Sequence, residues 1–146
     1  MEYTTELLIE LPREKVVRFF DNTENTIHWQ PGIKSLRLIE GSDRKVGARY
    51  RIVYEGRKSD LKVEETVLKR NLPDEYTTLH RSRGVKNTIQ NMFIENTPRQ
   101  TLWRMVNHFR FGGMMRLMAP FMKSAFASNS LLRMERFKRW IEQSQS

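Results

Sequence analysis

Six short segments of strand composition follow one another between residues 34 and 109, and only brief turns separate them. These turns carry the Gly, Pro, Asn and Asp residues that reverse a chain within a few positions. Strands joined in this way pair with reversed direction, so the sequence predicts an antiparallel meander. The expected strands are Lys34–Glu40, Ala48–Glu55, Ser59–Lys69, Glu75–Arg83, Lys86–Glu95 and Gln100–Phe109.

Helical patterns flank this meander. The segment "YTTELLIEL" predicts a further strand, and Pro12 suits the first turn of a helix over "REKVVRFF". The segment "TENTIHWQPGI" predicts a second, short helix that ends before Pro31, because a residue preceding proline leaves the α region. Gly112-Gly113 ends the last strand, and a long helix is expected from Met114 onward. The predicted architecture is a single α+β domain over residues 1–146, in the order strand, two helices, six strands, long helix.

Composition supports a soluble globular protein, with 38% hydrophobic and 29% charged residues in 146. The chain has no cysteine, which excludes disulfides, cysteine-ligated zinc and thiol catalysis. The N-terminal "MEYTTELLIELP" is acidic and lacks the apolar stretch of a signal peptide. We therefore expect a cytoplasmic location.

The net charge of +9 raises nucleic acid or an anionic membrane as partners. The basic residues are scattered, however, and are densest only in "RMERFKRW" near the C-terminus. The sequence contains no zinc-finger, RRM or KH pattern, so it disfavours nucleic acid and favours a solvated basic surface. A surface module that uses Arg136, Lys138 and Arg139 on an anionic membrane or RNA stays open as an alternative.

Four passages together carry a family resemblance that covers nearly the whole chain: "IELPREKVVRFFDNTENTIHWQPGIKSLRLIEG", "GARYRIVYEGRKSDLKVEETVLKRNLPDEY", "TPRQTLWRM" and "LMAPFMKSAFASNSLLRMERFKRWIEQ". Their order and spacing resemble the START-like (SRPBCC) superfamily with its helix-grip fold, and most of all its bacterial polyketide cyclase/dehydrase and lipid-transport branch. The resemblance implies a curved antiparallel sheet of about seven strands around the C-terminal helix. It also implies a hollow between sheet and helix for apolar or amphipathic molecules.

Alternation along the strands predicts which side chains face this hollow, because every second residue shares a face. In residues 75–83 and 86–95 both faces are nearly equally apolar, so alternation leaves their inward face open. The three rows expected to face inward are Tyr50, Ile52 and Tyr54; Leu61, Val63, Glu65 and Val67; and Trp103, Met105, Asn107 and Phe109.

The segment Phe111–Ser130 holds four of the eight methionines and is expected to form the opposite wall. Arg116 and Lys123 interrupt it, so it is too polar to span a membrane, although an interfacial helix stays open. Pro120 is expected to bend the helix or to lie in its first turn. Beyond Ser130 the apolar row shifts to Met134, Phe137 and Ile141. Methionine adapts to varied apolar partners, which favours a lined cavity over ordinary core packing.

The predicted cavity combines apolar and aromatic side chains with a few polar ones, as small-molecule sites do. Glu65 is the catalytic candidate, because desolvation in an apolar hollow would raise its pKa and allow acid–base chemistry, and a tyrosine is the alternative proton-transfer group. The predicted cavity residues are Tyr50, Ile52, Tyr54, Val63, Glu65, Ile89, Asn91, Trp103, Met105, Asn107, Met118, Phe121, Met122 and Ala125.

No cofactor or metal is expected. His28, His80 and His108 show no metal-ligand spacing, and the chain has no glycine-rich phosphate loop or nucleophile elbow. His108 is expected on the surface, and His28 in the packing between helix and loop.

The sequence therefore predicts a monomer or weak homodimer that carries or sequesters a hydrophobic or amphipathic small molecule, such as a lipid, polyketide-like or isoprenoid compound. A cyclase or dehydratase acting on a bound polyketide-like chain is the first alternative. Transient contact with a membrane surface is left open.

Overall fold

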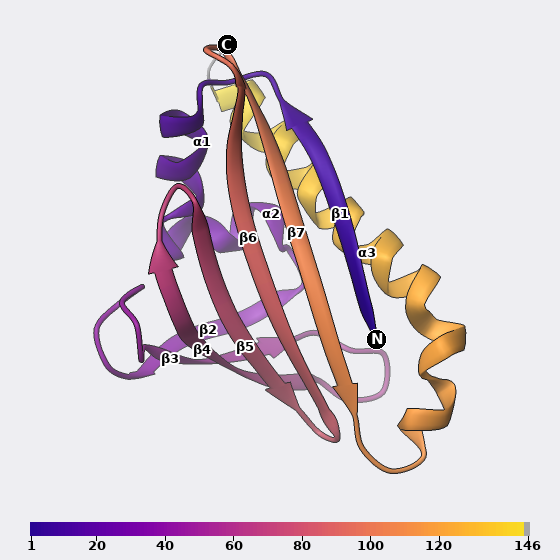
Figure 1. The fold of residues 1–146 in the computed structure, drawn as a ribbon. Helices are drawn as coiled ribbons and strands as arrows, with labels where there is room; N and C mark the ends of the chain where they lie inside the picture. Colours follow the sequence, from indigo (N-terminus) through magenta and orange to yellow (C-terminus); the bar gives the residue numbers. More distant parts are fainter. Residues whose placement is uncertain (145–146) are drawn as a thin grey trace.

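The strands form one curved sheet, and the C-terminal helix lies across its concave side (Figure 1). This computed structural model describes residues 1–144. The elements are β1 (Glu2–Ile9), α1 (Arg13–Phe20), the 3-10 helix η1 (Thr23–Asn25), α2 (Thr26–Trp29), β2 (Ile33–Glu40), β3 (Arg49–Tyr54), β4 (Leu61–Asn71), β5 (Glu75–Ser82), β6 (Val85–Thr97), β7 (Gln100–Phe111) and α3 (Met115–Ser144).

The seven strands pair in the order β1-β7-β6-β5-β4-β3-β2, and every neighbouring pair is antiparallel. The predicted meander is thus confirmed from β2 to β7. β1 adds to the far edge, with Leu7 opposite Trp103. It thereby places the N-terminal strand between β7 and the long helix (Figure 1).

The two short helices follow from local sequence signals. Pro12 precedes α1, which buries Val16 and Phe20. The Asn22 side chain accepts a hydrogen bond of 3.0 Å from the backbone N–H of Glu24 and so caps η1. α2 ends at Trp29, and Gln30 is already outside the helix ahead of Pro31.

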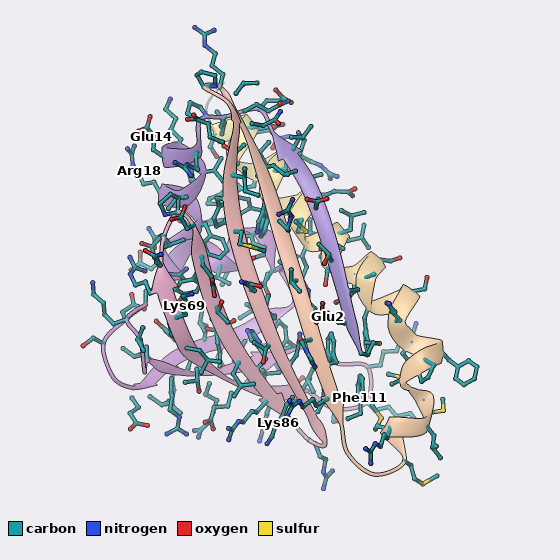
Figure 2. All side chains as sticks on the ribbon, in the orientation of Figure 1. Glu2, Glu14, Arg18, Lys69, Lys86 and Phe111 are labelled. Carbon is teal, nitrogen blue, oxygen red and sulfur yellow. The ribbon has the colours of Figure 1, made fainter. Side chains whose placement is uncertain are left out.

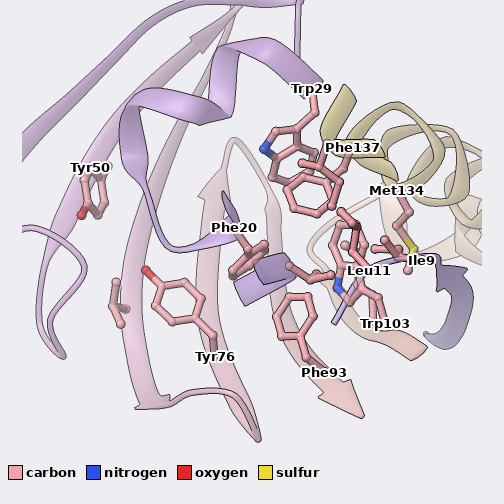
Figure 3. Close-up of a cluster of buried hydrophobic side chains, with 14 of the residues drawn as sticks. Ile9, Leu11, Phe20, Trp29, Tyr50, Tyr76, Phe93, Trp103, Met134 and Phe137 are labelled. Carbon is pink, nitrogen blue, oxygen red and sulfur yellow. The ribbon is translucent and has the colours of Figure 1, made fainter. Parts of the chain in front are cut away.

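An aromatic cluster holds the sheet, the short helices and α3 together (Figure 3). Trp103 of β7 lies 5.1 Å from Phe137 of α3 and 5.7 Å from Phe93 of β6, measured between ring centroids. Trp29 of α2 packs on Phe137 at 5.4 Å, and Phe20 of α1 on Phe93 at 4.9 Å. Aromatic pairs of this kind contribute about 0.5–1.5 kcal/mol each beyond the area they bury.

The C-terminal half of α3 packs on the sheet as the later apolar row predicts. Met134, Phe137 and Ile141 are fully buried, at spacings of three and four residues. The hydroxyl of Tyr3 on β1 lies 2.7 Å from that of Ser130, the first buried residue of this row.

The first turns of α3 project away from the sheet instead of covering it (Figure 1), and the helix returns to the sheet at Phe126, whose ring stacks 4.9 Å from that of Phe109 on β7. Met118 and Phe121 are 54% and 83% exposed, Ala125 is exposed and Met122 is only half-buried. Pro120 lies inside the helix, as its sixth residue.

Candidate functional site

A cavity of about 80 Å³ lies between the concave face of the sheet, the α1–α2 segment and the middle of α3. Its wall includes side chains from β2 to β7 and from all the helical segments. Ligand pockets usually measure roughly 300–1,000 Å³, so a larger ligand requires the wall side chains to move apart.

Eight of the predicted residues line this cavity: Tyr50, Ile52, Tyr54, Glu65, Ile89, Asn91, Met105 and Asn107. The inward face that alternation left open is now defined, because Ile89 and Asn91 on β6 and Tyr76, Thr78 and His80 on β5 line the cavity too.

The other six predicted residues lie elsewhere. Val63 and Trp103 are buried in the hydrophobic core and do not border the cavity. Met118, Phe121, Met122 and Ala125 are outside it, on turns of α3 that expose them or leave them half-buried. The residues of α3 that reach the cavity are instead Ser130 and Arg133.

Glu65 and His80 form a polar pair in the cavity wall. They are directly opposed on β4 and β5, and Oε1 of Glu65 lies 3.0 Å from Nε2 of His80. Burial acts to raise the pKa of Glu65, but the hydrogen bond and charge of His80, with Arg44, outweigh it and hold that pKa below its ordinary value. The expected rise is therefore wrong. The desolvation argument omitted a cross-strand partner.

Arg44 is fixed in the wall by two kinds of contact. Its Nε donates to Oδ1 of Asp21 at 2.8 Å, and its guanidinium stacks 4.5 Å from the ring centroid of Tyr76. Arg70 binds the same carboxylate through both amino groups, at 2.7 and 2.6 Å. Burial acts to raise the pKa of Asp21, but the two arginines outweigh it and lower that pKa. Asp21 therefore stays charged and positions Arg44 at the cavity.

Several polar atoms of the wall have no partner among the described residues. They include Oη of Tyr76, Nδ2 of Asn107 and Nη2 of Arg44. Burial raises the pKa of Tyr76, so its hydroxyl keeps its proton. All three atoms can then donate a hydrogen bond, and each one left unpaired costs about 1–3 kcal/mol.

Asn91 and Asn107 of the wall each accept one hydrogen bond through the side-chain oxygen. Trp103 donates from Nε1 to Oδ1 of Asn91 at 2.9 Å, and Asn107 accepts through Oδ1 from Asn87 at the same distance. Both asparagines therefore hold fixed positions on the cavity side of β6 and β7.

One end of the cavity wall carries Tyr54, Gln30 and Arg133. The Tyr54 hydroxyl donates to Oε1 of Gln30 at 3.1 Å, and the guanidinium of the exposed Arg133 lies 5.8 Å from the Tyr54 ring centroid. Within residues 1–144, Arg133 forms no ion pair with a carboxylate. Its charge is thus available to a bound anion.

The remaining histidines have structural surroundings. His28 stacks on Trp140 at 4.9 Å, within the packing of α2 against α3. The half-exposed His108 lies 3.4 Å from Glu2 on the outer face of the sheet. In the part of the chain that the structure describes, no three His, Asp or Glu side chains gather as metal ligands do. No helix of this part is long and apolar enough to cross a membrane.

The fold recurs in solved structures that share little sequence with this chain. A START superfamily protein from Mycobacterium smegmatis is 13% identical, with a TM-score of 0.81 over 97% of both chains. The Zhui aromatase/cyclase of Streptomyces sp. R1128 is 10% identical, with a TM-score of 0.81 over 100% of this chain and 96% of its own. A Thalictrum norcoclaurine synthase, solved with a transition-state analogue, is 11% identical, with a TM-score of 0.76 over 100% and 96%.

No protein-family model and no curated protein matches the sequence. The structural likeness establishes the START-like, helix-grip fold of this chain, as its sequence predicts.

The residues that sequence reasoning missed include Tyr76, His80, Arg44 and Arg133. His80 alternates with Tyr76 and Thr78, so it follows once the inward face of that strand is known. Arg44 lies in the turn "GSDRKVG", where no periodicity gives a side chain a direction.

Proposed function

We propose that this protein binds a hydrophobic or amphipathic small molecule, such as a lipid, a polyketide-like or an isoprenoid compound, in the cavity between sheet and α3. The observation that carries the proposal is a wall that combines apolar side chains with unpaired buried donors. Ile52, Ile89 and Met105 supply apolar surface, while Tyr76 and Asn107 supply the donors.

Unpaired donors favour a ligand that brings acceptor oxygens. Oη of Tyr76 and Nδ2 of Asn107 are buried, and no protein group among the described residues offsets their desolvation. A ligand that separates the wall side chains and places a carbonyl or hydroxyl oxygen beside these donors would accept their hydrogen bonds. Those bonds would offset the free energy of desolvation. The small resting volume fits a site whose side chains close together without ligand, since an empty cavity is destabilising.

Arg133 favours a ligand with an anionic end. An amphipathic molecule with its apolar part in the cavity would place its polar end beside the unpaired guanidinium and Tyr54. Two of the structural neighbours, a START superfamily protein and an aromatase/cyclase, are in keeping with a ligand of this kind.

A cyclase- or dehydratase-type enzyme is the second candidate, and the Glu65–His80 pair favours it. A carboxylate that accepts a hydrogen bond from an imidazole orients the ring, so that the ring can move a proton to or from a bound molecule. In this candidate His80 is the proton-transfer group and Glu65 the positioning residue. Turnover of an identified ligand should be lost in His80→Gln, while binding of that ligand remains.

The binding function is tested by native mass spectrometry of protein purified from its own host, together with the binding of apolar fluorescent probes. We expect a co-purified apolar compound, and probe binding that Ile89→Trp blocks by filling the cavity. Ile94→Trp, on the outer face of the same strand, is the matched control. Repeated preparations that carry no compound, and probes that neither bind nor raise Tm, would refute it.

A further inference from the structure

The first turns of α3 present an apolar stripe to solvent. Met114, which directly precedes the helix, and Leu117, Met118 and Phe121 within it follow the i, i+3, i+4, i+7 spacing of one helix face. They are 84%, 76%, 54% and 83% exposed, and the buried residue of these turns, Ala119, points to another side. A helix normally turns such a stripe inward, because burial stabilises each large side chain by about 1.5–3 kcal/mol.

A row of three basic residues crosses the outer face of the sheet at the same end of the molecule. Arg81 of β5 is directly opposite Lys86 of β6, which is directly opposite Arg110 of β7. All three are exposed, and within residues 1–144 none forms an ion pair. Like charges opposed across strands are destabilising, so the fold retains this basic row at a cost.

The apolar stripe and the basic row lie at the same end of the molecule, where the β5–β6 turn lies beside the connection from β7 to α3. The backbone N–H of Gly112 donates to the carbonyl of Gly84 at 2.9 Å. Figure 2 shows Lys86 and Phe111 together at this end, far from Arg18 on α1. Residues 76–94 and 96–134 contain no Asp or Glu. The acidic residues that flank the basic row have other partners: Glu64, opposite Arg81 on β4, pairs with Arg49, and Glu2 lies against His108.

We propose that this end of the protein docks on an anionic membrane surface. The apolar stripe enters the interface between headgroups and acyl chains, and the basic row attracts the lipid phosphates. Interfacial helices bind membranes through apolar and basic side chains together. The apolar stripe alone would give no preference for anionic lipid. The proposal is independent of the cavity and of its ligand.

Two other partners, a second copy of this chain and nucleic acid, fit this surface less well than an anionic membrane. A second copy would bring together two surfaces of the same sign in a protein of net charge +9. Nucleic acid would pair with the basic row but would leave Leu117 and Phe121 in water. The surface contact inferred here lies at the opposite end of α3 from the basic segment "RMERFKRW".

Co-sedimentation of the full chain with phosphatidylcholine vesicles, with and without phosphatidylglycerol, tests the docking. We expect binding only when phosphatidylglycerol is present, weakening as salt is raised. The double variant Leu117→Gln, Phe121→Gln should lower the affinity roughly tenfold or more. Each of Arg81→Gln, Lys86→Gln and Arg110→Gln should lower it about fivefold.

Matched controls separate docking from general charge and hydropathy. Arg18→Gln removes the same charge from an exposed position on α1, and Val46→Gln removes an exposed apolar side chain from the β2–β3 loop. Both should bind like the unchanged protein. Lys86→Gln should keep or raise Tm, since it relieves repulsion from Arg81 and Arg110. Equal binding to neutral vesicles, no binding at all, or a solution dimer that Leu117→Gln, Phe121→Gln dissolves would overturn the proposal.

Discussion

Glu65 and His80 face each other across β4 and β5, and 3.0 Å separates the carboxylate oxygen from the imidazole nitrogen. The carboxylate has its pKa lowered although its surroundings desolvate it. The cavity wall therefore holds a charged carboxylate paired with an imidazole, and not an isolated, protonated carboxyl group. A ligand in the cavity meets an oriented ring rather than a free carboxyl group.

The lowered pKa of Glu65 predicts a pH dependence of stability. A group whose pKa is lower in the folded state stabilises above its unfolded pKa, and that contribution is lost as pH falls through the folded pKa. Glu65→Gln should lower the free energy of unfolding at pH 7 by about 1.5–3 kcal/mol. The difference in free energy between the variant and the unchanged protein should become smaller below pH ~4. Urea denaturation at the two pH values measures this. Glu95→Gln, exposed on β6, is the control and should change neither value.

Asp21→Asn should destabilise the protein by about 3 kcal/mol, because Arg44 and Arg70 lose a shared carboxylate and remain partly buried. Asp74→Asn is the matched control, since Asp74 is 73% exposed and lies 3.9 Å from Arg13. Its effect should stay below about 1 kcal/mol. Chemical denaturation measures the free energy of unfolding of both variants. Equal losses of stability would contradict the role given to Asp21.

Tyr76→Phe should be neutral or stabilising by up to about 1 kcal/mol, because it removes a buried hydroxyl that has no partner. Tyr54→Phe should instead cost about 1 kcal/mol, since its hydroxyl donates to Gln30. Tm and denaturation midpoints report both. A strongly destabilised Tyr76→Phe would mean that this hydroxyl is satisfied in the protein without ligand.

Phe137→Ala should cost about 3–5 kcal/mol, because Phe137 is fully buried against Trp103 and Trp29. Phe121→Ala, on the exposed half of the same helix, should change stability by less than about 0.5 kcal/mol. The two substitutions delete the same side chain from one helix. Similar losses in thermal unfolding would show that both halves of α3 pack on the sheet.

Arg133→Gln should weaken the binding of a medium-chain acid such as octanoic acid by roughly tenfold, and leave the binding of octanol unchanged. Arg136→Gln removes an exposed cation one turn further along α3 and serves as the control. Titration calorimetry with both compounds measures the effect. An equal loss of affinity for the acid and the alcohol would show that Arg133 does not recognise the anionic group. Failure of both compounds to bind the unchanged protein would count against the cavity proposal itself.

The amino-acid sequence by itself determined the order of the elements and most of the inward faces of the strands. Turn residues lie next to the strand that they end, and alternation places Tyr50, Ile52 and Tyr54 on one face without reference to any other segment. The later row of α3, with Met134, Phe137 and Ile141, follows from helical spacing in the same way.

The tertiary structure decided which of these faces meet. The pairing of Glu65 with His80 depends on the register between two strands, and the position of Arg44 depends on Asp21 and Arg70, which are far away in sequence. The exposure of Met118 and Phe121 depends on how the first turns of α3 lie relative to the sheet. Periodicity shows that a helix face is apolar, but only the crossing of helix and sheet determines whether that face is covered.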